Sequence, residues 1–308
     1  ILLFEKHMSK DITLRQMRYF VAAAQSGQFS MAATVEHVSQ SAITNAVLAL
    51  EETLGTRLFE RLPQGVALTP DGQDFLNHAR HILDSVRDAV YKAPFRSHDL
   101  RGTVRVAASY TLLGYFLPEL MARFRATYPD IEIDLHDTDR ASIEQAVLDG
   151  DVDLGIALLS NVENIRRFQH HTLIRSRRQL WTSPTHPLTQ LNAPSLADIA
   201  KYPYILITVD EGEESTLRYW RRNEIEPNIA FRTSSMEALR GLVAYGFGVT
   251  ILSDMVFRPW SLEGKRIEAR PILNAIPQMD AGMLWRKGAT LDTPAVAFQQ
   301  FLIHACGS

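Results

Sequence analysis

The sequence predicts an α/β protein with a winged helix-turn-helix at its amino-terminal end and a long helix behind it. Three observations support this fold class. The chain has 308 residues, about twice the usual length of one domain. Apolar residues recur at helical spacing over residues 11–62 and again from residue 70 to residue 93. From residue 98 on, strand-like and helix-like segments alternate, which is typical of α/β domains. We therefore expect three parts: residues 9–69, 70–97 and 98–308.

The first part is predicted to hold three short helices. In the first of them Leu14, Met17, Val21 and Ala24 recur at helical spacing, with Phe20 beside them, and Gly27 ends it. We expect Ser30 to cap a second helix over residues 31–37. Ser39 can cap the third, which ends at Gly55 and has the apolar stripe Ile43, Val47, Leu50 and Leu54.

A small β-hairpin follows these helices. Residues 57–62 and 66–68 have strand character, and Pro63-Gln64-Gly65 between them is a turn sequence. Three helices and a hairpin in this order make a winged helix-turn-helix.

The second part is predicted to be one long helix. Thr69, Pro70 and Asp71 form a strong helix start, and Pro94 ends the pattern after Ala93. A helix of about 24 residues is about 36 Å long. Its narrow apolar seam favours pairing with a second copy of the chain over packing along its own domain, and both alternatives stay open. The seam consists of Phe75, Ala79, Ile82, Val86 and Ala89, widened by Leu83 and Val90.

The third part alternates between strands and helices. Strands are expected at residues 104–108, 131–135, 152–157, 204–208 and 249–252, and helices at residues 112–127, 142–148, 215–223 and 236–245. Helices between strands imply parallel sheets, and parallel sheets bind ligands at the carboxyl ends of their strands.

Composition excludes several classes of protein. Hydrophobic residues make up 46% and charged residues 22%, an ordinary globular balance. No apolar run approaches the roughly 18 residues that a membrane-spanning helix needs, so we expect no membrane partner. No export signal opens the sequence, and we expect a cytoplasmic protein. Cys306 is the single cysteine, which excludes an intrachain disulfide and a cysteine-rich zinc site.

Enzyme motifs are absent from the sequence. It contains no Gly-x-Ser-x-Gly, no glycine-rich phosphate loop and no His-Glu-x-x-His. His170 and His171 are adjacent, so their side chains would point apart on a strand or turn. We therefore expect no catalytic residues and no metal.

The net charge of −3 needs to be divided among the parts. Residues 9–69 hold five Lys or Arg and five Asp or Glu, and residues 70–97 hold four of each. The excess of acids therefore belongs to residues 98–308, and low net charge does not speak against DNA binding by the first part. With so few cations there, strong DNA binding should need two or more copies of the chain.

Five short motifs in the first 72 residues occur in a characteristic order. They are Gly27-Gln28-Phe29-Ser30-Met31-Ala32-Ala33, Val38-Ser39-Gln40-Ser41-Ala42-Ile43-Thr44, Leu50-Glu51-Glu52-Thr53-Leu54-Gly55, Leu58-Phe59-Glu60-Arg61 and Leu68-Thr69-Pro70-Asp71-Gly72. In residues and spacing they resemble the amino-terminal domain of LysR-type transcriptional regulators. The resemblance implies double-stranded DNA as a partner, a dimer through residues 70–93, assembly into a tetramer and contact with RNA polymerase.

The third helix is the recognition helix that this resemblance implies. Short polar residues at its start suit the major groove and the DNA phosphates. Gln40 and Asn45 could bind adenine edges, whereas Ser39 and Ser41 suit phosphates, and Ser39 could serve as helix cap as well. The complete predicted DNA-binding set is Ser39, Gln40, Ser41, Thr44 and Asn45, with Arg61 and Gln64 of the wing.

Two positions depart from the pattern of the family. Glu36 stands where leucine is usual, so either Val35 takes the core position or the helix is rotated, because a buried carboxylate is costly unless it is paired. The arginine or lysine that often occurs around Thr44 to Ala46 is missing, which weakens the assignment of individual base contacts.

For residues 98–308 the resemblance implies two α/β subdomains of the periplasmic-binding-protein type with a small-molecule effector in the cleft between them. Hydroxyl-bearing residues at strand ends favour a polar or carboxylate metabolite. The acids nearby could instead favour a ligand with an amino group, although we expect them to be solvated. The predicted effector contacts are Ser109, Tyr110, Thr111, Thr138, Asp139, Thr208, Val209, Asp210, Phe247 and Gly248. Beyond this effector we expect no cofactor.

Two other functions remain possible at this point. The chain could be a constitutive architectural DNA-binding protein whose sensor domain is vestigial. It could also be an enzyme built on the binding fold, although no group of residues predicts one.

Overall fold

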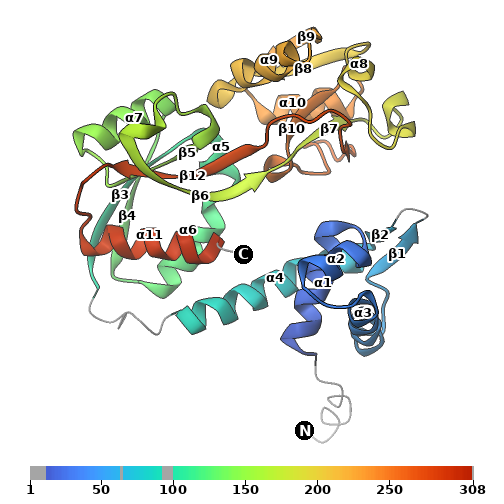
Figure 1. Cartoon of the computed structure of the whole chain (residues 1–308), viewed down its shortest axis with the longest axis horizontal. Helices are drawn as coiled ribbons and strands as arrows, with labels where there is room; N and C mark the ends of the chain where they lie inside the picture. The colour runs from blue at the N-terminus through green and yellow to red at the C-terminus, as the bar shows by residue number, and fades with distance from the viewer. Residues whose placement is uncertain (1–11, 63–64, 92–99, 307–308) are drawn as a thin grey trace, which may run out of the picture. The chain divides into compact units, whose positions relative to one another are not determined.

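The computed structural model describes residues 12–62, 65–91 and 100–306, and the chain forms two compact units, residues 1–95 and residues 96–308 (Figure 1). The first unit is a winged helix-turn-helix that continues into a long helix. Its elements are α1 (Leu14–Ser26), α2 (Phe29–Val35), α3 (Gln40–Leu54), the antiparallel strands β1 (Phe59–Leu62) and β2 (Gly65–Leu68), and α4 (Pro70–Tyr91).

Aromatic packing holds the first unit together. The buried Phe20 ring of α1 lies 5.2 Å from the Phe59 ring of the wing and 5.1 Å from the Phe75 ring of α4, centroid to centroid. Ile43 and Leu50 of α3 are fully buried beneath it, as the predicted stripe requires. One core therefore joins the three helices, the wing and the start of α4.

The ends of α1, α2 and α3 follow the sequence at three of four predicted positions. Gly27 and Gly55 end α1 and α3 in the left-handed conformation, and the Ser39 hydroxyl caps α3 by accepting the Ala42 N–H. The prediction that Ser30 caps α2 is wrong, because α2 begins at Phe29 and has no side-chain cap. The Phe29 ring packs 5.5 Å from the Phe59 ring, so burial of this ring places the first turn earlier than the hydroxyl would.

Glu36 is accommodated by an ion pair. Its carboxylate accepts a hydrogen bond of 2.7 Å from Arg18 Nε of α1. The alternative in which Val35 takes the core position is wrong, because Val35 is 64% exposed. Ala32 and Ala33 form the buried face of α2 in its place.

The start of α4 packs on the wing. The Thr69 hydroxyl accepts the Gly72 N–H at 2.9 Å, as expected of the cap. Leu76 and Ala79 are buried in the core of the first unit. Ile82 and Val86 remain 40% and 38% exposed, and the side chains of Ala89 and Val90 lie outside the described residues, as does Ala93. The first turns of α4 thus pack against their own unit, whereas Ile82 and Val86 in the following turns form an exposed apolar pair.

The second unit begins with a subdomain built on one five-stranded sheet. The strand order is β4-β3-β5-β12-β6, in which β3, β4 and β5 are parallel while β12 runs antiparallel to both β5 and β6. Helices α6 and α11 pack on one face and α7 on the other (Figure 1). The elements are β3 (Gly102–Ala108), α5 (Tyr110–Tyr115), α6 (Leu117–Thr127), β4 (Ile131–Asp137), α7 (Arg140–Asp149), β5 (Leu154–Leu158), β6 (Phe168–Ser176), β12 (Met279–Arg286) and α11 (Thr293–Cys306), with 3-10 turns η3 (Leu159–Asn161) and η4 (Ile165–Arg167).

The second subdomain is inserted between β6 and β12. Its strands form the sheet β10-β7-β11 and the parallel pair β8-β9, and Tyr204 of β8 bridges to Val249 beside β10. Helix α10 packs on one side of these strands, and α8 and α9 pack on the other. The elements are β7 (Arg178–Thr182), α8 (Leu196–Ile199), β8 (Pro203–Ile207), α9 (Gly212–Arg222), β9 (Asn228–Thr233), α10 (Met236–Ala244), β10 (Thr250–Ser253) and β11 (Glu268–Arg270), with 3-10 turns η5 (Pro187–Gln190), η6 (Val209–Glu211) and η7 (Asp254–Val256).

The chain passes twice between these subdomains. It leaves the first after Ser176 and enters β7 at Arg178, and it returns between Arg270 and Met279. All five predicted strands are present, but the prediction of parallel sheets holds only for β3, β4 and β5 and for the pair β8-β9, because β12 and β6 join antiparallel and the sheet β10-β7-β11 is antiparallel throughout. The predicted helix over residues 112–127 is interrupted at Phe116, just before Pro118 at the start of α6.

Candidate DNA-binding surface and effector cleft

The predicted recognition residues lie on the outer face of α3. Gln40, Ser41 and Asn45 are exposed, and Thr44 is half-buried with its hydroxyl donating to the Gln40 carbonyl oxygen at 3.0 Å. Ser39 is also exposed, and its hydroxyl lies 2.9 Å from that of Ser41. The cap of α3 and the exposed hydroxyls therefore coincide at one helix end, as the sequence suggests.

A groove runs between α3, the start of α2 and the wing. Gln40 and Thr44 line it from α3, and Arg61 lines it from β1. Gln28 and Ser30 line it from the start of α2, although neither belongs to the predicted DNA-binding set. Ser41 and Asn45 lie outside this groove, and Gln64 lies outside the described residues.

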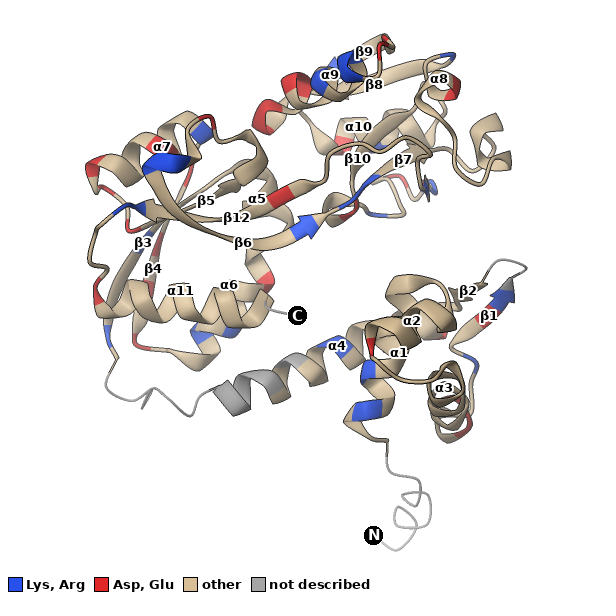
Figure 2. Cartoon of the chain, viewed as in Figure 1, with Lys and Arg blue, Asp and Glu red and all other residues tan. Residues whose placement is uncertain are grey.

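Helix α3 itself carries no Lys or Arg (Figure 2). The cations of this unit lie around it, with Arg18 on α1 and Arg61 on the wing. Arg18 already pairs with Glu36, and this nearby negative charge weakens the attraction of Arg18 for a DNA phosphate. Polar groups, rather than cations, thus dominate the surface of α3.

A cavity lies between the two subdomains of the second unit. Thr111, Leu158 and Asn161 line it from the first subdomain. The second subdomain and the start of β12 contribute the rest, which are Arg178, Ile207, Val209, Asp210, Gly212, Ser215, Thr216, Met236, Ile251, Leu252, Ser253, Val256 and Met279. Its wall is mostly apolar with a few polar groups, which is typical of sites for small molecules.

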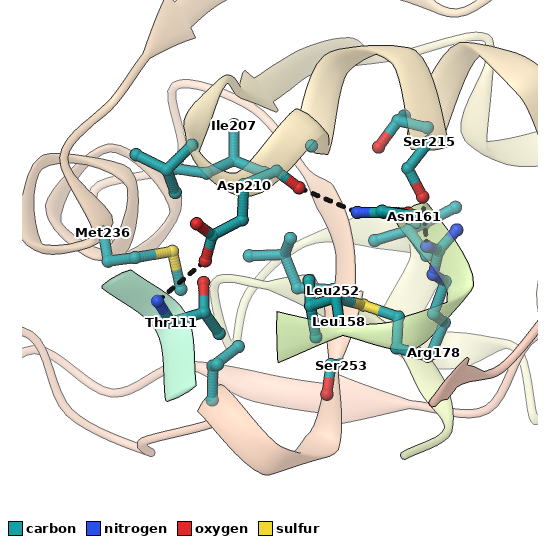
Figure 3. A pocket seen from close by; sticks show the side chains of 16 residues that line it. Thr111, Leu158, Asn161, Arg178, Ile207, Asp210, Ser215, Met236, Leu252 and Ser253 are labelled. Atoms are coloured by element: carbon teal, nitrogen blue, oxygen red, sulfur yellow. Dashed lines mark hydrogen bonds between the residues drawn. The ribbon is translucent and has the colours of Figure 1, made fainter. Parts of the chain in front are cut away.

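Asp210 reaches across this cleft (Figure 3). Its carboxylate accepts the Thr111 N–H at 2.7 Å, and its backbone carbonyl oxygen accepts from Asn161 Nδ2 at 2.8 Å. Asp210 and Glu211 both adopt a left-handed backbone, with φ of 49° and 55°. Such backbone strain persists only where contacts impose it, and here the contacts come from the opposite subdomain.

Glu211 makes a second contact between the subdomains. Its carboxylate accepts from Arg140 Nε at 3.1 Å. Burial raises the pKa of Glu211, and the nearby Arg140 partly offsets this rise. Residues 208–211 therefore form a loop that binds the first subdomain through two acids, and we call it the latch loop.

Among the described residues, Arg178 is the one Lys or Arg that lines the cavity. Its Nη2 donates to the Ser215 hydroxyl at 2.6 Å (Figure 3). Its guanidinium carbon lies 5.0 Å from the Tyr219 ring centroid. Burial lowers the pKa of this guanidinium, which remains charged near neutrality. Within the described residues no carboxylate lies at ion-pair distance from it.

The predicted effector contacts separate into two groups. Thr111, Val209 and Asp210 line the cavity. Ser109 and Tyr110 immediately precede Thr111, and Ser109 is buried with its hydroxyl 3.5 Å from the Asp210 carboxylate. Thr208 opens the latch loop beside them.

The remaining predicted contacts lie elsewhere. Phe247 and Gly248 precede β10 next to Pro203, at the start of β8, whereas the cavity lies beyond the end of β8. β10 runs in the same direction as β8, so the residues before it fall at the opposite edge, away from this cavity, and their contact with an effector stays a prediction. Thr138 also lies outside the cavity, and Asp139 caps α7 by accepting from Ser142, which lowers the pKa of Asp139.

Asn161, Arg178 and Ser215 are cavity residues that sequence reasoning missed. Arg178 stands in the run Arg175-Ser176-Arg177-Arg178, where period-two alternation would have put Arg178 on the face opposite to Arg175 and Arg177. This alternation could have singled out Arg178. Nothing in the run, however, marks where β6 ends and β7 begins.

Comparisons with known proteins agree with this architecture. The family model described as "Bacterial regulatory helix-turn-helix protein, lysR family" matches residues 14–73, and the one described as "LysR substrate binding domain" matches residues 97–307. The chain belongs to the LysR family of transcriptional regulators. It is therefore a DNA-binding regulator with an effector-binding domain, in a family of regulators rather than of enzymes.

The likeness to individual LysR-type proteins extends over nearly the whole chain. The regulator is 29% identical to the HTH-type transcriptional regulator YnfL of Escherichia coli, over 96% of this chain and 99% of that protein. It is 28% identical to the RuBisCO operon transcriptional regulator of Allochromatium vinosum, over 95% and 96% of the two chains. The crystal structure of HinK from Pseudomonas aeruginosa matches with a TM-score of 0.61 and 26% identity, over 95% and 98% of the two chains.

The described residues of this LysR-type regulator contain neither a cluster that could hold a metal ion nor a helix that could span a membrane. No group of three His, Cys, Asp or Glu lies close enough together there to hold a metal ion. Within the same residues, every helix is too short or too polar to span a lipid bilayer.

Proposed function

We propose that this LysR-type regulator binds a small anionic effector in the cleft between its subdomains and reads its operator with Gln40, Asn45 and the wing. The effector contacts Thr111, Asn161, Arg178 and Ser215, and Arg178 supplies the opposite charge. The regulator acts in the cytoplasm, as a dimer through α4 that pairs into a tetramer and contacts RNA polymerase.

The uncompensated charge of Arg178 carries the proposal for the effector. A charge removed from water is costly unless an opposite charge accompanies it. Ser215 and the Tyr219 ring supply polar contacts but no formal charge. Asp210 is the one acid that lines the cavity, and its carboxylate accepts the Thr111 N–H. A carboxylate, phosphate or sulfate group from solution would complete the charge balance, because a guanidinium binds such groups through two parallel hydrogen bonds.

The same observation weighs against a vestigial sensor in a constitutive architectural DNA-binding protein. Such a protein has no need of a cavity that contains an uncompensated cation. A ligand can control the regulator only if it binds one arrangement of the subdomains more tightly than another. The latch loop supplies such a difference, since its contacts to Thr111 and Arg140 exist only when the subdomains approach each other.

The effector proposal is tested on the full-length protein with a library of carboxylate and phosphate metabolites. Compounds that raise the melting temperature are examined for a change in the length of the DNA footprint. Arg178→Gln should weaken binding of an active compound by roughly tenfold or more, since hydrogen bonds to charged groups are worth about 1.5–3 kcal/mol. DNA binding without the compound should be unchanged.

Arg177→Gln is the matched control, because Arg177 is the exposed neighbour and lies outside the cavity. Equal effects of the two substitutions would contradict the assignment of Arg178. A library in which no compound changes the footprint would favour the constitutive protein.

The DNA-reading proposal is tested with operator variants. Gln40→Ala should lower the preference for one base pair in each half-site by about 1–3 kcal/mol, measured as a ratio of affinities. Gln25→Ala removes an exposed side chain of the same kind from α1 and should leave the preference unchanged. A uniform loss of affinity for all operator variants would instead mean that Gln40 contacts the DNA backbone.

A further inference from the structure

A second cavity lies on the other side of Arg178. Helix α9 lines it with Ser215, Arg218, Tyr219 and Arg222, which share one face because their spacing is that of successive helical turns. Ser160 and Asn161 line it from the first subdomain, and Pro277 and Gln278 line it from the segment that returns to β12. The two cavities share Asn161, Arg178 and Ser215 and are therefore neighbours.

Of the residues that the structure describes, three with guanidinium groups line this cavity and no acid does. Arg222 has no ion pair with any described residue, and neither has Arg178. Arg218 donates to Glu214 at 2.9 Å, but both side chains of that pair are exposed, at 45% and 69%, which makes the pair weak.

The nearby acids are engaged outside this cavity. Glu213 pairs with Arg232 at 3.1 Å, and Glu211 pairs with Arg140 across the cleft. Arg178 and Arg218 repel each other, which, after burial, is a further cause of the lowered pKa of Arg178. This corner is thus positive within a domain whose acids outnumber its cations.

We infer that Arg178, Arg218 and Arg222 form an anion subsite beside the effector cleft, which takes a multiply charged group such as a phosphate or a pair of carboxylates. This inference rests on the proposed function, because it describes a ligand whose other end occupies the cleft. It assigns that ligand to the phosphorylated or polycarboxylate metabolites.

An anion in this subsite would also contact the connection between the subdomains. Asn161 belongs to the first subdomain, the arginines to the second, and Gln278 to the returning segment. A ligand that bridges the three would favour the arrangement in which they converge, and this gives the bound anion a means to change the regulator's conformation.

Isothermal titration calorimetry of the full-length protein tests the subsite, with pyrophosphate as one probe and citrate as the other, at constant ionic strength. Both probes should bind the unmodified protein. Arg222→Gln should weaken the binding by roughly tenfold, as expected for the loss of one charged hydrogen-bonding group. A preference for pyrophosphate would assign the subsite to phosphate groups, and a preference for citrate would assign it to carboxylates.

Arg221→Gln is the matched control. Arg221 precedes Arg222 on α9 and is also exposed, but it does not line the cavity. Equal weakening by both substitutions would mean that only the general field of the helix attracts the anion, and would overturn the inference. Failure of both probes to bind would overturn it as well.

The failure of this inference can be distinguished from failure of the proposed function. If an effector from the metabolite library depends on Arg178 but binds Arg222→Gln with unchanged affinity, the cleft is the effector site and the subsite does not exist. If Arg222→Gln weakens the binding of that effector and Arg221→Gln does not, a ligand other than the two probes also supports the subsite.

Discussion

Gly72 has space for no side chain, although its backbone is an ordinary helical one. A Cβ atom built at Gly72 would lie 2.0 Å from the Leu58 carbonyl oxygen, which is backbone and cannot rotate away. The same glycine donates its N–H to the Thr69 hydroxyl. One residue thus fixes both how α4 starts and how closely it approaches the wing.

We predict that Gly72→Ala destabilises the first unit by about 1–3 kcal/mol, the usual cost of overpacking. Urea unfolding followed by circular dichroism measures the change in free energy. Gln73→Ala is the control, since Gln73 is exposed in the same turn and alanine favours the helix there. Unfolding at the same urea concentration for Gly72→Ala and the unmodified protein would contradict the close approach.

Asp198 illustrates how a residue in a helix cap contributes to the dependence of stability on pH. Its carboxylate accepts from Ser195 Oγ at 2.7 Å and from Lys201 Nζ at 3.0 Å, and chiefly the Ser195 bond lowers the pKa of Asp198 to about 2. A group with a lowered folded-state pKa stabilises the protein above its unfolded pKa, and this contribution disappears as the pH falls toward the folded value.

We therefore predict that Asp198→Asn flattens the fall in unfolding free energy between pH 5 and pH 3, where the unfolded carboxyl begins to protonate and the folded one does not. The effect should be small, because the Asp198 side chain is 35% exposed. Urea midpoints at several pH values measure it. Asp137→Asn, at an exposed strand end, should not reproduce the change.

In the second unit, the latch loop holds two adjacent residues other than glycine in the left-handed region. Asp210 and Glu211 both hold positive φ values, which residues other than glycine seldom adopt. Asparagine tolerates this backbone, so Asp210→Asn removes the charge without changing the fold of the loop.

We predict that Asp210→Asn weakens the contact with the Thr111 N–H by about 1 kcal/mol, the difference between a charged and a neutral hydrogen bond. Exchange of the Thr111 amide hydrogen should become roughly fivefold faster, because 1 kcal/mol changes an opening equilibrium by about that factor. Glu226→Gln removes an exposed charge from the same subdomain and should leave this exchange rate unchanged. An unchanged rate in Asp210→Asn would show that other contacts hold the latch loop closed.

At the scale of the whole molecule, we expect DNA affinity to depend on how many DNA-binding units one complex holds. Residues 9–69 have no net charge, so a single unit gains little from the counterion release that drives DNA affinity. Ile82 and Val86 lie one turn apart on α4 and are exposed within a single chain. A second copy would cover them.

We predict that Ile82→Glu with Val86→Glu lowers the dimer affinity at least tenfold, because both copies would bring like charges to an apolar seam. Light scattering coupled to size-exclusion chromatography measures the mass, and operator affinity should fall with it. His81→Glu with Ser85→Glu places two equal charges at neighbouring exposed positions of the same turns and should preserve the dimer. A dimer that survives the Ile82 and Val86 changes would assign self-association to other residues.

Sequence patterns predict an element well where neighbouring residues determine it. The caps at Ser39 and Thr69 and the glycine ends at Gly27 and Gly55 depend on residues within one or two turns. The Ser30 cap was predicted by the same rule and is wrong, because a distant aromatic contact at Phe29 outweighs a local hydroxyl. Glu36 needs a partner eighteen positions away, which no local pattern identifies.

The sequence by itself determined the winged helix-turn-helix, the long helix and the strand–helix alternation, since periodicity and capping are local properties of the chain. Only the tertiary structure decided that Asp210 contacts Thr111, that Arg178 lies between two cavities with no described carboxylate at ion-pair distance, and that Phe247 and Gly248 lie at the far edge of β8. These facts depend on two crossings between subdomains and on strand direction. Both are set by packing between segments a hundred residues apart, which the spacing of neighbouring residues does not encode.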